Sequence, residues 1–298
     1  HVSPDLEGQP EECGRRCGGE DHHQERRAQQ QRGHRNCEPR QPGVTVFDDW
    51  SIASLRPYID WTPFFSTWEL AGRHPQILDD AVVGAQAREL LRDANAMLDQ
   101  IETEGWLRAK AVVGIWPANA VGDDVELYPS PVGAASAATA ALPVAAEAAP
   151  TGEAMRRLHF LRQQADKPPG RPDFCLADFV APKDSGVRDW IGAFAVTAGL
   201  GIDAHVARFE AAHDDYSSIL LKALADRLAE ALAEALHERV RRELWGYAAD
   251  EALDPQALID EGYRGVRPAP GYPACPDHTE KGTLFALLDA PGNAGMAL

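Results

Sequence analysis

The chain has 298 residues, of which 44% are hydrophobic and 25% charged, and its formal net charge is −17. This length and composition are typical of a soluble globular protein with a substantial core. The acidic balance argues against a nucleic-acid partner, which needs a basic surface to displace counterions from phosphates. Five scattered cysteines predict reduced thiols and a cytoplasmic location. The most apolar tract, 132–150, is mostly alanine and contains Pro143 and Glu147, so we expect no membrane span.

Residues 1–43 differ from the rest of the chain. They are rich in Arg, Gln, Glu, His and Gly and nearly free of large apolar residues, which predicts a disordered or unrelated N-terminal segment. The alternative is a metal site built from Cys13, Cys17, His22, His23 and Cys37. No second well-spaced ligand pair follows the Cys-x-x-x-Cys motif, so we predict no metal site.

Residues 44–128 contain the first predicted elements. The segment 58–65 is dense in aromatic residues, and we expect Pro63 to break any helix there. Apolar residues at helical spacing predict an amphipathic helix over 82–104, which Gly105 ends. A buried strand over 111–116 and a hairpin partner over 125–128 are expected next, joined through 117–119 and 122–124.

The second half begins with an Ala/Pro/Ser-rich low-complexity insert, 130–153, which is typical of a surface loop. The elements expected after it are strands over 158–162 and 191–197, a long helix over 206–245, and a further element from 283 to 288. Near the end of the long helix, Arg239, Arg241 and Arg242 suit the helix dipole, and Gly246 is its expected cap. Because helices and strands do not alternate regularly, the pattern favours an α+β fold over a doubly wound parallel sheet.

The loop from 267 to 276 is the strongest candidate for a binding site. Its four prolines stiffen the backbone, and Gly271 allows a bend or close approach of a ligand. Arg267 offers a planar fork for a carboxylate, and Tyr272 offers a ring face. Such a loop suits a small zwitterion that carries an aromatic base. The alternative is a structural Pro-rich turn in which Arg267 pairs with a nearby carboxylate.

Two acids are further candidates. Asp60 either faces a ligand ammonium or sulfonium or caps the turn that follows it. Glu230 lies in the long helix near Arg227 and Glu234, where a solvated helix face is the ordinary interpretation. Cys275 and His278 form a poor catalytic dyad, because no third group is evident, and we expect no catalytic residue in this chain.

Several segments occur in the order found in one known family. They are 58–65 (YIDWTPFF), 116–119 (WPAN) with 122–124 (GDD), 162–164 (RQQ), 175–179 (CLADF), 191–197 (IGAFAVT), 209–216 (FEAAHDDY) and 267–281 (RPAPGYPACPDHTEK). Over 44–298 the chain closely resembles the activation domain of cobalamin-dependent methionine synthase. The resemblance implies a single curved domain with a bent antiparallel sheet flanked by helices, incomplete at its C-terminus.

The resemblance also implies a site for S-adenosylmethionine. Its residues here would be Asp60, Arg267, Gly271 and Tyr272, with backbone from Ala269 and, more loosely, Glu230. In our hypothesis Arg267 binds the methionyl carboxylate and Asp60 the ammonium.

The function implied is reactivation of oxidised cob(II)alamin, a step that supports methionine biosynthesis. An electron from flavodoxin or a flavin reductase would reduce a cobalamin carried by another domain, which would then take the methyl group. The chain would thus act as part of a methyltransferase and would not make methionine alone. The alternative is a non-catalytic module that docks a cobalamin domain or flavodoxin and has lost ligand binding.

Overall fold

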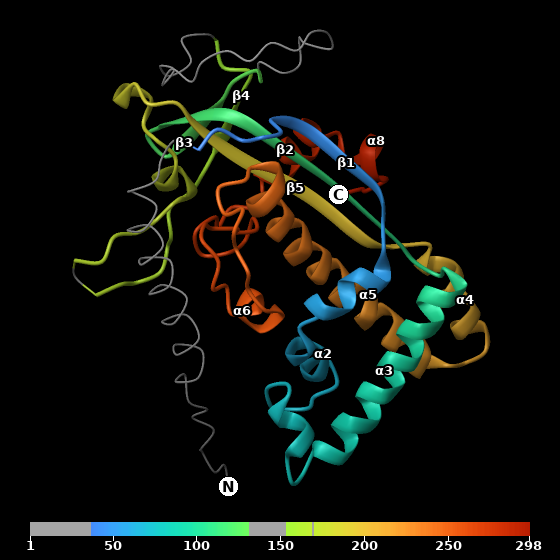
Figure 1. The fold of residues 1–298 in the computed structure, drawn as a ribbon. Helices are drawn as coiled ribbons and strands as arrows, with labels where there is room; N and C mark the ends of the chain where they lie inside the picture. Colours follow the sequence, from blue (N-terminus) through green and yellow to red (C-terminus); the bar gives the residue numbers. More distant parts are fainter. Residues whose placement is uncertain (1–36, 131–152, 169) are drawn as a thin grey trace, which may run out of the picture.

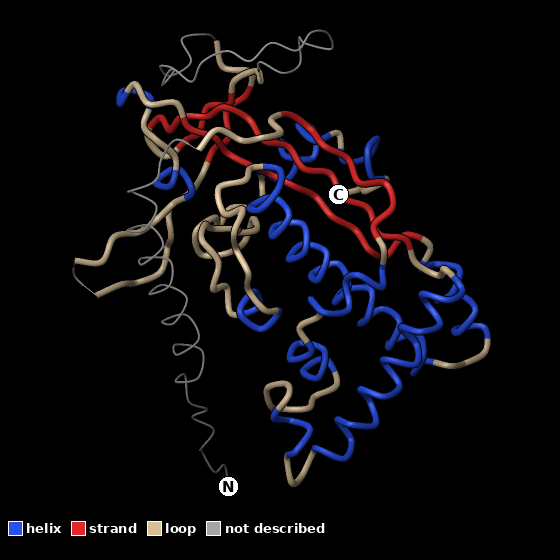
Figure 2. Tube along the Cα trace, in the orientation of Figure 1, coloured by secondary structure: helices blue, strands red, loops and turns tan. Residues whose placement is uncertain are grey.

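The computed structural model describes residues 37–130, 153–168 and 170–298. Five antiparallel strands form one curved sheet with helices packed on it (Figures 1 and 2). The strands are β1 (Gly43–Trp50), β2 (Arg108–Val121), β3 (Asp124–Leu127), β4 (Arg156–His159) and β5 (Asp189–Leu200). The α+β fold class with a bent antiparallel sheet is confirmed.

The long strand β2 organises the sheet. It pairs with β5 along one edge and with β1 and then β3 along the other, and β4 extends the sheet beyond β3. Side chains of β2 alternate between two cores. Val113 and Ile115 pack in a large core with α5 (Asp215–Arg239) and α3 (Gly84–Glu104), whereas Val112 and Trp116 pack in a smaller one on the opposite face.

Pro117 lies inside β2, where a connection was expected. The Pro117 carbonyl accepts a hydrogen bond from the Tyr128 amide at 2.9 Å, so the nitrogen of Pro117 faces the edge shared by β1 and β3. Pairing with β1 ends at Ile115 and pairing with β3 begins at Ala118. Because the proline falls between the two partners, the strand continues without a missing ladder bond. The turn itself lies at Gly122, which has a φ of 63°.

The expected helix over 82–104 is confirmed as α3, which ends at Gly105 in the left-handed conformation with a φ of 67°. The expected long helix is interrupted. It is divided into α4 (Ile202–Ala211), α5 and a π-helical turn, Val240–Leu244. His213 has a φ of 56°, and the Asp214 side chain accepts a hydrogen bond from the Ser217 amide at 3.0 Å. This N-cap starts a new helix, which residue spacing alone did not reveal.

Pro63 does not break a helix, contrary to expectation. It is the third residue of α2 (Trp61–Thr67), for which Asp60 is the N-cap. Amides in the first turn have no intrahelical acceptor, so a proline there costs no backbone hydrogen bond. The remaining helices are η1 (Ile52–Tyr58), η2 (Gln76–Asp79), η4 (Leu176–Phe179), η5 (Lys183–Ser185), α6 (Pro255–Ile259), α7 (Glu280–Leu288) and α8 (Ala290–Ala294). The element expected from 283 to 288 lies within α7.

Most of the predicted N-terminal segment, most of the insert and four of the five candidate metal ligands lie outside the described residues. The end of that segment contacts the domain. The Arg40 and Gln41 amides donate hydrogen bonds to the carbonyls of Trp245 and Leu244, and the Trp245 indole donates to the Cys37 carbonyl at 2.8 Å. The boundary near residue 43 stays a prediction.

Candidate functional site

The loop that starts at Arg267 forms a compact double turn. The Tyr272 amide donates to the Ala269 carbonyl at 3.0 Å, the Cys275 amide to the Tyr272 carbonyl at 2.9 Å, and the Gly271 amide to the Cys275 carbonyl at 2.7 Å. Ala269, Gly271 and Tyr272 are all exposed, and 54% of Tyr272 is accessible. The turn therefore presents backbone and one aromatic ring to solvent, as a ligand-binding loop would.

Gly271 suits this turn because of its backbone conformation. Its φ is +108°, in the region that residues with a side chain rarely adopt. A Cβ atom there would also lie 2.4 Å from Cε1 of His278. His278 thus packs directly on the turn.

Arg267 is mostly buried and forms an ion pair with Glu234 of α5. Burial opposes the charge of Arg267, but Glu234 and Tyr263 outweigh it and raise the pKa of the guanidinium. Burial raises the pKa of the Glu234 carboxyl, against the lowering effect of Arg267 and Arg241. The structural alternative considered for Arg267, pairing with a nearby carboxylate, is therefore observed.

The Arg267–Glu234 pair nevertheless has unused hydrogen-bonding capacity. Nε of Arg267 and Oε2 of Glu234 are buried without a hydrogen-bond partner. An unpaired donor and an unpaired acceptor in one buried pair are costly unless another molecule satisfies them. A carboxylate suits the first atom and an ammonium the second, which is the chemistry of an amino acid.

Asp60 lies in a different segment and has local contacts. Its Oδ1 accepts a hydrogen bond from the Thr62 amide at 2.9 Å, so the capping role considered for it is observed. Tyr58, two residues earlier, donates to Glu238 of α5 at 2.6 Å, and burial raises the pKa of Tyr58 to about 12. Glu234 and Glu238 are one helical turn apart, so the segment before Asp60 and the Arg267 loop attach to neighbouring turns of α5.

Glu230 is exposed, as the solvated-face interpretation expected, but it acts electrostatically on Arg267. A cleft of about 260 Å³ lies beside the Tyr58–Glu238 bond, and a larger one of about 650 Å³ lies near Lys183. Neither of these two clefts in the described part of the chain is lined by Asp60 or Arg267. The structure thus groups Arg267 with Glu230, Glu234 and its own loop. It does not place Asp60 in that group, because the observed hydrogen bond of Asp60 is the local one to Thr62.

Sequence reasoning missed two residues of this site, Glu234 and Tyr263. Acids at positions 230, 234 and 238 repeat every four residues beside the buried Leu232 and Leu236, which marks a second stripe along α5. That spacing was available in the sequence. The pairing of Glu234 with a residue 33 positions later was not.

The thiol of Cys275 is unsuited to nucleophilic chemistry. Burial raises its pKa to about 11, so the thiol stays protonated at neutral pH. Cys37, Cys175 and Cys275 are all free thiols. Within the described ranges no group of three potential metal ligands comes together.

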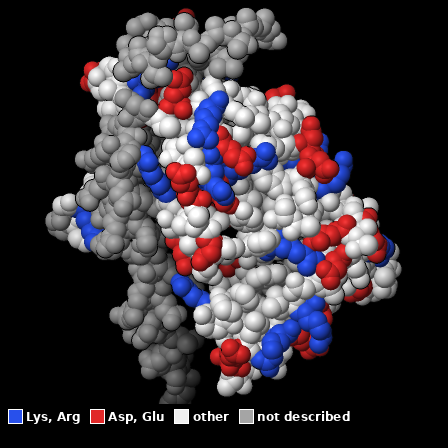
Figure 3. Space-filling view, in the orientation of Figure 1, with Lys and Arg blue, Asp and Glu red and all other residues white. Residues whose placement is uncertain are grey.

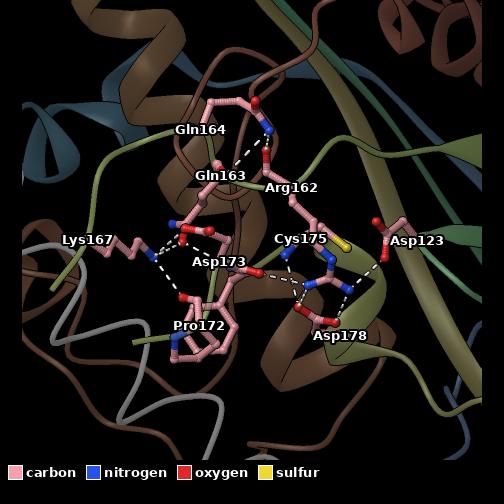
Figure 4. Close-up of polar contacts among 10 residues, drawn as sticks. Asp123, Arg162, Gln163, Gln164, Lys167, Pro172, Asp173, Cys175 and Asp178 are labelled. Atoms are coloured by element: carbon pink, nitrogen blue, oxygen red, sulfur yellow. Dashed lines mark hydrogen bonds and ion pairs between the residues drawn. The ribbon is translucent and has the colours of Figure 1, made fainter. Parts of the chain in front are cut away.

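A second polar cluster explains three of the sequence motifs (Figure 4). Arg162 binds both oxygens of Asp178 at 2.8 Å and Oδ1 of Asp123 at 2.6 Å, and it also donates to the Asp173 carbonyl. The Cys175 amide donates to Asp178 at 3.0 Å. The Arg162 guanidinium thus links the β2–β3 turn to η4, which is a structural role.

The surface carries both signs of charge. On the face drawn in Figure 3, acidic and basic side chains lie next to one another. Among the helices described, none combines the length and the apolar character needed to cross a bilayer.

Comparison with known proteins agrees with this geometry. Residues 51–298 match the family model described as vitamin B12 dependent methionine synthase, activation domain. A crystal structure of the MetH reactivation domain bound to AdoHcy is 51% identical in sequence and superposes with a TM-score of 0.79. The match covers 89% of this chain and 76% of that one. With its curved sheet and its Arg267 loop, the chain belongs to the activation domains of vitamin B12-dependent methionine synthase.

Proposed function

We propose that this chain binds S-adenosylmethionine and supports the reductive methylation of cob(II)alamin held by another domain of methionine synthase. The observation that carries the proposal is the buried Arg267–Glu234 pair with one unsatisfied donor and one unsatisfied acceptor. The similar reactivation domain whose crystal structure contains AdoHcy supports the same ligand class. We infer a cytoplasmic protein that meets flavodoxin or a flavin reductase as electron donor.

The residues of the chain would hold the ligand rather than react with it. S-adenosylmethionine supplies an activated methyl group, because its sulfonium is already a good leaving group. Nε of Arg267 would donate to the methionyl carboxylate. The ammonium would bind Asp60, and acids along α5 would add to its binding. Exposed Tyr272 would contact the adenine ring, with Ala269 and Gly271 giving backbone contacts. The contribution to rate would be positioning of the methyl group.

Calorimetric titration with S-adenosylmethionine tests the proposal. Replacing Arg267 with Ala is expected to weaken binding by about 2–5 kcal/mol, because a buried charged partner of the carboxylate is lost. Arg264→Ala is the matched control, since Arg264 lies in the same segment but stacks on Tyr247, 5.6 Å from its ring centroid. The control should bind as the wild type does.

Two results would count against the proposal. Unchanged affinity in the Arg267→Ala variant would reject the site. No heat and no thermal stabilisation with the wild type would favour the alternative, a docking module that does not bind the ligand.

A further inference from the structure

Arg241, one of the three arginines expected to suit the helix dipole at the end of the long helix, is fully buried in the turn that follows α5. The turn that contains it is π-helical, and the Trp245 amide donates to the Val240 carbonyl, five residues back, at 2.8 Å. A π-turn holds an extra residue and rotates the side chains in it. Neighbouring Arg242 is exposed, so Arg241 is buried and Arg242 is not, although they are adjacent in the same turn.

The guanidinium of Arg241 is held on several sides. Its Nε lies 3.0 Å from both carboxylate oxygens of Glu251, and its Nη1 lies 2.7 Å from Nδ1 of His237. The guanidinium carbon is 4.2 Å from the ring centroid of Tyr263. The His237 ring meets the same tyrosine edge-on at 4.7 Å. Tyr263 is therefore fixed by two linked neighbours, a buried arginine over its ring and a buried histidine edge-on to it.

Tyr263 in turn contacts the proposed ligand site. It is 4% exposed and lies four residues before Arg267. Its hydroxyl is hydrogen-bonded with the Arg267 guanidinium, and its charge environment includes Glu234. Arg267 is thus held by both Glu234 and Tyr263, and Tyr263 is itself fixed by Arg241 and His237.

We propose that Tyr263, clamped by Arg241, is a positioning residue that aims the Arg267 guanidinium at the carboxylate of the ligand. The inference rests on the proposed function. An arginine side chain has many rotamers, and fixing it before binding removes that entropic cost from the binding step. Neither Arg241 nor Tyr263 needs to touch the ligand. If Tyr263 merely filled the core, a phenylalanine would serve equally well.

The decisive variant is Tyr263→Phe, which keeps the ring under Arg241 and removes only the hydroxyl. Two ligands are titrated by calorimetry: S-adenosylmethionine and its decarboxylated form, which keeps the sulfonium, the ammonium and the nucleoside. We expect Tyr263→Phe to weaken S-adenosylmethionine about tenfold, the size of effect typical for a hydrogen bond to a charged group. The affinity for the decarboxylated ligand should not change, because the carboxylate that Arg267 binds is absent.

Tyr247→Phe is the matched control. Its hydroxyl donates to the Arg264 carbonyl at 3.3 Å, so the variant also removes a tyrosine hydroxyl bonded to the same segment without contacting Arg267. Arg241→Lys keeps the positive charge but removes the planar guanidinium. Like Tyr263→Phe, it should weaken S-adenosylmethionine and leave the affinity for the decarboxylated ligand unchanged. Thermal melts of each variant without ligand separate loss of affinity from loss of folded protein.

Failure of the positioning role and failure of the proposed function give different results. If the wild type binds S-adenosylmethionine and Tyr263→Phe binds both ligands as the wild type does, the positioning role is wrong and the proposed function stands. An equal loss for both ligands also overturns it, since the effect would not pass through the carboxylate. If the wild type does not bind S-adenosylmethionine, the proposed function fails and this inference with it.

Discussion

Individual side chains in this domain are used mainly to join distant segments. Arg267 reaches back to Glu234 and Arg162 reaches to Asp123 and Asp178. Glu126 of β3 does the same. It is 6% exposed and accepts hydrogen bonds from Lys183 at 2.7 Å, from Tyr128 at 2.8 Å and from Arg157. Such buried carboxylates make stability depend on pH.

The Glu126 carboxylate should stabilise the fold above about pH 4.5. Hydrogen bonds from Lys183 and then Tyr128 lower its pKa to about 2, against an opposing effect of burial. Because the folded pKa is below the ordinary value of 4.5, the stabilisation is present above pH 4.5 and is lost as pH falls towards 2. We expect Glu126→Gln to cost about 1–2 kcal/mol at pH 7, after allowance for screening of half-exposed Lys183 and Arg157.

Urea unfolding at pH 7 and pH 3 measures this effect. The variant should lose less stability than the wild type between the two pH values. Glu210→Gln, which breaks the exposed pair with Lys222, is the control and should change stability by less than about 0.5 kcal/mol. Parallel pH dependence in wild type and Glu126→Gln would contradict the assignment.

At the scale of single elements, burial on both faces makes β2 the least tolerant strand. Gly114 lies in it beside Trp116, and a Cβ atom on Gly114 would be 2.1 Å from Cη2 of that indole. Gly192 lies across from Ile115 on β5, and a Cβ atom there would be 3.6 Å from Trp245, an ordinary contact. Two glycines in adjacent strands thus differ sharply in the space around them.

Alanine substitution should reveal this difference. Gly114→Ala is expected to destabilise the domain by about 1–3 kcal/mol, because the indole must shift in a packed core. Gly192→Ala should be neutral or stabilise by about 0.4–1 kcal/mol through the unfolded chain. Chemical denaturation of both variants checks the prediction, and equal effects would show that the indole has room to move.

At the scale of the whole molecule, one strand links the two cores. Residues of β2 alternate between the large core around α5 and the smaller core that includes β3, α7 and α8. Damage to either core therefore removes contacts that hold the same backbone. This arrangement favours unfolding as one unit rather than as two layers.

Leucine deletions in each core test that coupling. Leu232→Ala in the large core and Leu127→Ala in the smaller one should each cost about 2–5 kcal/mol, because both side chains are fully buried. Trp190 and Trp116 lie in the large and the smaller core respectively, so fluorescence reports on both. Thermal transitions by fluorescence and by circular dichroism should coincide in both variants. Two separated transitions in either one would mean that the layers unfold independently.

Local pattern by itself determined much of this protein. The 3.6-residue period and Gly105 predicted α3 to within two residues, and the apolar run at 111–116 predicted the centre of β2. The order of motifs identified the family. These features depend on burial and backbone preference along a short stretch of chain, which neighbouring residues are sufficient to encode.

Only the tertiary structure decided which charges meet. It paired Arg267 with Glu234, turned Arg241 inward through a π-turn, and attached Tyr58 and Arg267 to neighbouring turns of α5. It also placed Pro63 where a helix tolerates it and Pro117 between two partner strands. The charge pairings and the place of Pro117 depend on contacts between residues far apart in sequence. The energy of a buried charge or a missing amide is set by what packs against it, which no local spacing encodes.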